Sequence, residues 1–117
     1  MVFENAVAQA PWTLPSHVTM LTSLPPNQHQ VTADFTRLKP EAVTLAEVLK
    51  EQGYATAAFV SAAVLERRYG LDQGFEVYDD DLGDGREARM VVERPAAATV
   101  DAALAWLAGL AEGERFF

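Results

Sequence analysis

Thr13 is the residue whose type and position in this sequence best suit covalent chemistry. We predict a helix that has Pro15 in its first turn and runs to about Ser23, because proline suits a first helical turn, where its missing N–H costs little. A hydroxyl in the loop before such a helix lies near the positive end of the helix dipole and near free N–H groups that hold an anion well. A threonine hydroxyl is a weak nucleophile until a base or a divalent metal ion activates it. The alternative is that Thr13 only starts the helix, since Thr before Pro-Ser is common helix-start chemistry.

Two histidines belong to the same region. His17 lies in the first turn of the predicted helix, where it could bond an ester or steady the Thr13 loop. A histidine there is otherwise a surface or capping residue. His29 follows a Pro-Pro pair and could be a general acid or a metal ligand, but we expect a structural role for it.

Charged residues gather in two further places. Residues 79–81 and Asp84 are carboxylates at the short spacing that suits Ca²⁺, but the glycine and the terminal glutamate of an EF-hand loop are not at their positions. We therefore predict a solvated acidic loop. Arg67 and Arg68 could steer an anionic substrate, although a solvated helix face is the simpler interpretation.

Residues 10–31 read APWTLPSHVTMLTSLPPNQHQV and resemble the nucleophile region of the sulfatases and their phosphodiesterase relatives in the alkaline phosphatase superfamily. Sulfatases have Cys or Ser where this chain has Thr13, and Arg where it has His17. The nucleotide phosphodiesterase branch has Thr and His at these positions. Residues 44–59 and 74–80 also resemble segments of bacterial sulfatase-type proteins, so the resemblance covers about residues 3–117.

The resemblance implies an α/β fold, a partial three-layer sandwich with a mainly parallel sheet, cut from an alkaline-phosphatase-like fold. Residues 1–117 would be an internal fragment of a sulfatase-like catalytic domain, without the upstream Asp pair and the downstream Asp and His ligands of the metal site. The full-length protein would hydrolyse a small-molecule sulfate or phosphate ester with a divalent metal ion (Zn, Ca or Mn). Thr13 would be nucleophile and metal ligand and His17 would bind substrate, while the fragment alone would hold no metal and be inactive.

The chain departs from the sulfatase pattern in three respects. Sulfatases convert Cys or Ser into formylglycine, and the extra methyl group of Thr13 does not allow the same aldehyde to form. His17 replaces the arginine that helps to hold that residue. Ser23 and Gln30 replace glycines, which matters if those positions need positive φ. A non-catalytic sulfatase-like domain that binds anionic ligands or partners is therefore the alternative, and a plain α/β interaction module is a third interpretation.

The rest of the sequence alternates between helix and strand patterns, which favours a mainly parallel sheet. Thr44 and Glu47 form a capping-box pattern for a helix that Gly53 would end. We predict further elements as follows: a buried strand over 54–61, a short helix over 62–69 ended by Gly70, a short strand over 75–78, irregular chain over 27–43, and the start of another strand at 115–117.

Residues 95–111 give the clearest helical pattern. Val100, Leu104, Leu107 and Leu110 recur at helical spacing with Trp106 beside them. We expect this apolar stripe and Trp106 to lie in the core.

The composition limits the classes of function. A length of 117 residues fits one domain, and the formal net charge of −8 disfavours nucleic acid and anionic membranes as partners. The chain has no cysteine, hence no disulfide and no thiolate metal site, and no apolar run of about 18 residues that would span a membrane. The N-terminus lacks the basic region of a signal peptide. A fragment of a larger sheet would expose apolar edges, so we expect the isolated chain to form homo-oligomers.

Overall fold

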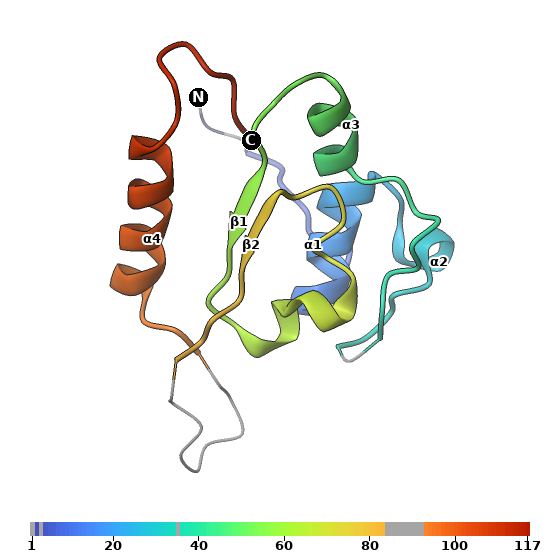
Figure 1. Ribbon diagram of the computed structural model, residues 1–117. Helices are drawn as coiled ribbons and strands as arrows, with labels where there is room; N and C mark the ends of the chain where they lie inside the picture. The colour runs from blue at the N-terminus through green and yellow to red at the C-terminus, as the bar shows by residue number, and fades with distance from the viewer. Residues whose placement is uncertain (1, 3, 35, 84–92) are drawn as a thin grey trace.

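The computed structural model describes residues 2, 4–34, 36–83 and 93–117. Its sheet has strands β1 (Ala57–Phe59) and β2 (Val77–Asp79), which pair in parallel. The α-helices of the described residues are α1 (Thr13–Thr22), α2 (Pro26–His29), α3 (Leu45–Glu51) and α4 (Ala96–Ala108). Helix α4 lies on one side of the sheet and α1 and α3 lie on the other (Figure 1), which confirms the predicted layered α/β arrangement.

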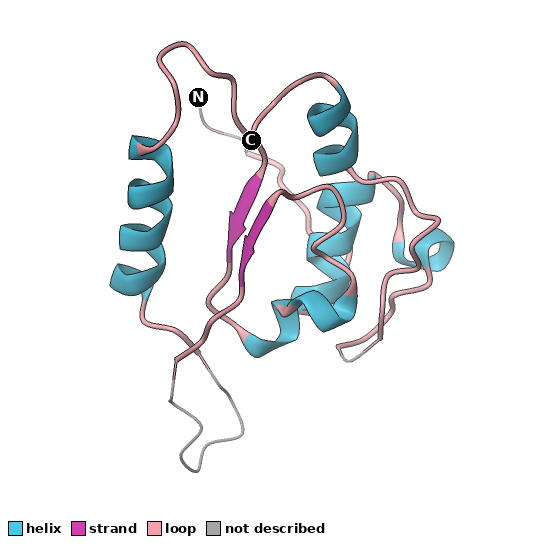
Figure 2. Cartoon of the chain, in the orientation of Figure 1, coloured by secondary structure: helices cyan, strands magenta, loops and turns pink. Residues whose placement is uncertain are grey.

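The C-terminal segment extends the sheet on the side of β1 away from β2. The Phe117 N–H donates to the Ala55 carbonyl oxygen over 2.9 Å, and the Ala57 N–H donates to the Phe117 carbonyl oxygen over 3.0 Å. Ala55 and Phe116 form a parallel bridge. The residues predicted to start another strand therefore pair with the segment that leads into β1, in parallel. Figure 2 shows β1 and β2 as two neighbouring arrows, which also pair in parallel.

Helix α3 begins where the capping-box pattern predicts. The Glu47 N–H donates to the Thr44 hydroxyl over 3.2 Å, and the Thr44 N–H donates to a Glu47 carboxylate oxygen over 2.7 Å. These two bonds satisfy groups that the helix cannot satisfy itself. Gly53 follows the C-cap with φ of 76°, as expected of a residue that ends a helix.

Two predicted segments differ from the structure. Chain expected to be irregular from residue 27 instead forms α2, with Pro26 in its first position, where no N–H is needed. The short helix predicted over 62–69 is split into two 3₁₀ turns, η1 (Ala63–Leu65) and η2 (Arg67–Tyr69). Glu66 separates them because its ψ of 151° is extended and cannot continue a helix.

The core lies on the α1 side of the sheet. Leu14 and Val18 of α1 are fully buried. They belong to one cluster with Val31, Leu38, Leu65, Tyr69 and Leu71. Tyr78 of β2 packs against this cluster, so α1 is fixed to the sheet through its apolar face.

The prediction that the apolar stripe of the last helix belongs to the core is wrong for the described structure. Val100 and Leu104 of α4 are 54% and 57% exposed, and no residue of α4 is buried. Helix α4 is held instead by Trp106, whose ring centroid lies 6.1 Å from that of Phe59 and 6.2 Å from that of Phe116. Helical periodicity identifies the face that is suited to burial, but it does not say that a partner covers that face.

The two positions at which this chain has Ser23 and Gln30 in place of the family glycines lie in turns on either side of α2. Ser23 ends α1 with φ of 58°, and Gln30 ends α2 with φ of 63°, so both residues are left-handed. Glycine adopts this conformation without the Cβ clash that other residues suffer. The left-handed backbone at Ser23 and Gln30 is therefore the conformation that suits the glycines of the family.

Replacing Ser23 with glycine is expected to raise the free energy of unfolding by about 0.5–1 kcal/mol, because it removes the strain of a left-handed non-glycine residue. The measurement is urea unfolding followed by circular dichroism. Ser16→Gly is the matched control, since Ser16 lies inside α1 and the same substitution there is expected to lower stability by about 0.5 kcal/mol. Changes of the same sign in both variants would contradict the prediction.

Candidate functional site

Thr13 is the exposed first residue of α1, not a residue of the loop before it. The helix already includes Thr13 because Trp12 is the N-cap, and the Trp12 carbonyl oxygen accepts the Ser16 N–H over 3.2 Å. Pro15 then falls inside the first turn, where its missing N–H costs nothing. Within the described residues, no hydrogen bond engages the Thr13 hydroxyl.

The supply of free N–H groups at the start of α1 is small. The Leu14 N–H donates to a carboxylate oxygen of Asp34 over 3.1 Å, and Pro15 has no N–H to offer. Among the described residues this leaves the Thr13 N–H as the first-turn donor without a partner. The sequence did not point to Asp34, because it lies 20 residues away in an irregular segment. An anion that approaches Thr13 would therefore meet a carboxylate beside the helix N-terminus.

His17 lies one turn after Thr13 on the same helix and is partly buried. Its Nδ1 lies 2.8 Å from the Thr13 carbonyl oxygen. A carbonyl oxygen only accepts, so Nδ1 carries the proton of this bond, and in the neutral ring Nε2 is then an acceptor. The structure thus brings Thr13 and His17 together through the backbone, while the Thr13 hydroxyl receives no base from the described residues.

His29 is buried, with an exposed fraction of 5%, and it links α2 to α1. The Val31 N–H donates to Nδ1 over 3.0 Å, so Nε2 carries the proton and donates to the Thr19 hydroxyl over 3.1 Å. Burial, the larger cause, lowers the pKa of His29 below its ordinary value of 6.5. With both ring nitrogens bonded, His29 has the structural role that the sequence favoured.

The free energy of unfolding is expected to fall as the pH drops below about 6.5, because the unfolded chain binds a proton at His29 more readily than the folded chain does. The loss continues down to the lowered pKa of the folded state. Chemical unfolding at several pH values measures it. His29→Gln cannot titrate, so it should be less stable but should lack this contribution to the slope of the free energy of unfolding against pH. An unchanged slope in that variant would contradict the prediction.

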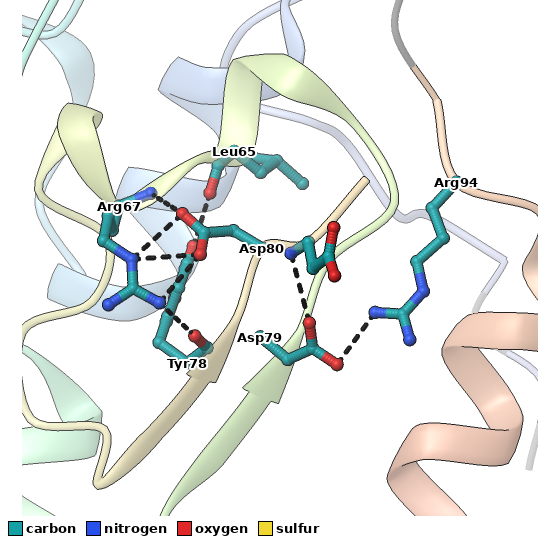
Figure 3. A network of polar contacts seen from close by, with 7 residues as sticks. Leu65, Arg67, Tyr78, Asp79, Asp80 and Arg94 are labelled. Atoms are coloured by element: carbon teal, nitrogen blue, oxygen red, sulfur yellow. Dashed lines mark hydrogen bonds and ion pairs between the residues drawn. The ribbon is translucent and has the colours of Figure 1, made fainter. Parts of the chain in front are cut away.

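Two acidic residues, Asp79 at the end of β2 and Asp80 just after it, form ion pairs with arginines (Figure 3). The Arg67 guanidinium donates to both oxygens of Asp80 at 2.8–3.1 Å and to the Tyr78 carbonyl oxygen over 2.6 Å. Hydrogen bonding to Arg67 lowers the pKa of the Asp80 carboxyl. Asp79 pairs with Arg94 over 2.8 Å. The prediction of a solvated loop therefore does not describe Asp79 and Asp80, and Arg67 is engaged in a contact that joins η2 to β2.

The described residues do not offer a metal site. They contain no group of three or more His, Asp or Glu side chains that could hold an ion. Asp79 and Asp80 have arginine partners, Asp84 lies outside the described residues, and Thr13 supplies one oxygen alone. A divalent ion needs several oxygen or nitrogen donors at once, so this donor set does not fit one.

No helix among the described residues combines the length and the apolar character needed to cross a membrane.

Comparison with known proteins agrees with the resemblance carried by the Thr13 segment. The family model described as Sulfatase matches residues 1–102. No curated protein and no solved structure matches the chain with significance. Since the match extends over most of the 117 residues, from before Thr13 to within α4, the chain belongs to the sulfatase family of hydrolases.

Proposed function

We propose that Thr13 is the nucleophile with which a sulfatase-type catalytic domain cleaves a small-molecule sulfate or phosphate ester, and that residues 1–117 are the segment of that domain which carries it. The observation that supports this most is the position of Thr13. It is the exposed first residue of α1, and its hydroxyl is unengaged within the described residues. The resemblance of residues 10–31 to the nucleophile region of the family would put the nucleophile at this residue.

The reaction would be a double displacement. The Thr13 oxygen attacks the phosphorus or sulfur atom in line, the bond from that atom to the alcohol oxygen breaks, and the departing alcohol takes up the proton that Thr13 loses. Water then cleaves the new bond to Thr13 and releases the inorganic anion. The negative charge of the transition state needs several fixed positive groups, whereas in the described residues the first turn of α1 offers the free Thr13 N–H, beside Asp34.

This shortage of positive groups leads us to place the metal ligands, for Zn, Ca or Mn, in the remainder of the catalytic domain. His17 would meet the bound ester through Nε2, because Nδ1 is bonded to the Thr13 carbonyl oxygen. The 117-residue chain alone should then have no enzyme-like turnover. Thr13 itself favours phosphate over sulfate, since oxidation of a threonine gives a ketone and not the aldehyde of formylglycine.

The test is to trap the intermediate. The complete catalytic domain, loaded with each of the three metals, is quenched during turnover of nitrophenyl phosphate, bis-nitrophenyl phosphate or nitrophenyl sulfate, and its peptides are analysed by mass spectrometry. The expected result is a phosphoryl or sulfuryl group on the peptide that contains Thr13. A label on a different residue would refute the assignment. The ester that gives the label shows whether the chemistry is that of the sulfatases or of their phosphodiesterase relatives.

A second candidate function is a non-catalytic domain that binds anionic ligands. It is favoured by one observation, namely that no base within the described residues contacts the Thr13 hydroxyl. Complete domains that bind inorganic phosphate or sulfate but turn over none of the three esters would support this function and exclude the first.

We also propose that the isolated chain self-associates. The apolar residues Val100, Leu104 and Phe116 are more than half exposed, and the segment ending at Phe117 lies at a sheet edge. Sedimentation should give a mass that rises with concentration, and a constant monomer mass would contradict this.

A further inference from the structure

Asp34 brings a carboxylate to the start of α1 from an irregular segment. Its Oδ1 accepts a hydrogen bond from the Leu14 N–H over 3.1 Å. Trp12, the N-cap of α1, makes no side-chain capping bond, so Asp34 supplies the acceptor that an N-cap side chain supplies in other helices. Asparagine caps a helix about as well as aspartate does. The capping bond therefore does not by itself account for a charged residue at this position.

The negative charge of Asp34 has no positive partner in the part of the chain that the structure describes. Helix α1 contains no lysine, arginine, aspartate or glutamate. The ion pairs of the described chain join other residues: Lys50 with Glu76, Arg67 with Asp80, Arg68 with Glu66, and Arg94 with Asp79. Asp34 is also partly buried, which reduces the screening of its charge by water. Its carboxylate therefore opposes the positive end of the α1 dipole.

Asp34 lies close enough to Thr13 to act on an anion bound there. The Leu14 nitrogen belongs to the peptide group that follows Thr13, and ordinary bond lengths place this nitrogen no more than about 5 Å from the Thr13 hydroxyl oxygen. The distance from Asp34 Oδ1 to that oxygen is therefore at most about 8 Å. The Debye length at physiological ionic strength is also about 8 Å, so salt screens the interaction only in part.

Resting on the proposed function, we infer that Asp34 is a specificity-determining residue that favours esters with one negative charge over esters with two. A phosphate monoester carries two charges well above its second pKa of about 6, whereas a sulfate monoester and a phosphate diester carry one. Coulomb repulsion grows in proportion to the charge of the ester. At this distance, and discounted for the partial exposure of Asp34, repulsion weakens binding about threefold for each unit of charge.

Asp34→Asn tests the charge apart from the hydrogen bond. The side-chain oxygen of asparagine accepts the Leu14 N–H as the carboxylate does, so the start of α1 stays capped. Asp34→Ala removes both the charge and the cap. Asp101→Asn is the matched control, because Asp101 is exposed on α4, on the other side of the sheet, and its replacement changes the net charge equally. Circular dichroism shows first that the variants fold.

The experiment compares kcat/KM for nitrophenyl phosphate with that for the singly charged bis-nitrophenyl phosphate and nitrophenyl sulfate, in the complete, metal-loaded domain at about pH 8. In Asp34→Asn, the ratio of the doubly charged to the singly charged ester is expected to rise about threefold or more. Asp101→Asn should leave this ratio within about 1.5-fold of the wild type. An unchanged ratio in Asp34→Asn would overturn the inference. A change confined to Asp34→Ala would do the same, because Asp34 would then act through its capping bond.

A binding measurement on the 117-residue chain gives a second readout that needs neither metal nor turnover. Phenyl phosphate and phenyl sulfate share one organic group and differ in charge, and NMR follows their binding on the Thr13 amide at about pH 8. Asp34→Asn is expected to raise the affinity for phenyl phosphate about threefold or more beyond its effect on phenyl sulfate. Equal effects on the two anions, or no saturable shift with either anion in Asp34→Asn, would overturn the inference.

Thr13→Ala separates this inference from the proposed function. This variant keeps the backbone N–H at position 13 and the contact between Asp34 and Leu14, so Asp34→Asn should raise the relative affinity for phenyl phosphate in its background as well. Loss of the charge preference together with the Thr13 hydroxyl would overturn the assignment to Asp34. A charge preference that persists while the trapping experiment labels another residue would refute Thr13 as nucleophile and leave the role of Asp34 intact.

Discussion

Replacing Thr13 with alanine in the complete, metal-loaded catalytic domain is expected to lower kcat for the preferred ester by about 10⁴-fold or more, the range seen when a covalent nucleophile is removed. The loss follows because no other hydroxyl of the described chain begins a helix with its oxygen unengaged and exposed. The fold should be untouched, since Thr13 packs against nothing in the core and alanine is a better helix former. Steady-state kinetics with nitrophenyl esters provide the measurement.

Two variants control for this result. Thr22→Ala removes a hydroxyl from the same helix, but that hydroxyl donates to the Val18 carbonyl oxygen, and kcat should stay within about twofold of the wild type. Thr13→Ser keeps the nucleophilic oxygen and should retain most of the activity. If Thr13→Ala turns over the ester as fast as the wild type, the nucleophile lies elsewhere. If the wild type turns over none of the esters, the non-catalytic function stands.

The features of the fold that the sequence predicted depend on short-range physics. The capping box at Thr44 and Glu47 and the end of α3 at Gly53 each follow from a local pattern that no distant contact overrides. The partial alkaline-phosphatase-like sandwich follows from the order of these elements and from the family match.

The features that the sequence did not predict depend on contacts between distant residues. Asp34 reaches the start of α1 only because an irregular segment folds back across 20 residues. The apolar stripe of α4 was assigned to the core from its spacing alone, but what lies against a face is decided by tertiary packing. At the candidate site, the motif identified Thr13 and His17 as the residues to consider. It could not predict that His17 would bond the Thr13 carbonyl oxygen and leave the hydroxyl alone.

Gly74 belongs to the family resemblance, and the structure gives a physical reason for glycine at this position. It lies in the turn before β2 with φ of 84°, pressed against the first turn of α3. A Cβ atom there would lie 2.6 Å from the carbonyl carbon of Ala46 and would also strike the backbone nitrogen of Glu47. Both are backbone atoms of a capped helix, so they cannot move aside as the end of a flexible side chain can. The neighbouring bond from the Thr56 hydroxyl to the Gly74 carbonyl oxygen, of 2.8 Å, fixes the turn from the other side.

Gly74→Ala is therefore expected to lower the free energy of unfolding by about 3 kcal/mol or more, which combines the cost of a left-handed alanine with that of overpacking against backbone. For a domain with so small a core, such a loss is a large fraction of the total stability, and the melting temperature should fall by more than about 10 °C. Gly113→Ala is the matched control: its φ of 80° is equally left-handed, but an added Cβ meets nothing within 4 Å. It should lose only about 1 kcal/mol. Urea unfolding of the two variants separates the cost of a left-handed alanine, which both variants have, from the cost of overpacking, which Gly74→Ala has in addition. Equal losses would mean that α3 moves away from Gly74 at little cost, and that the contact between this turn and the helix does not hold the sheet in place.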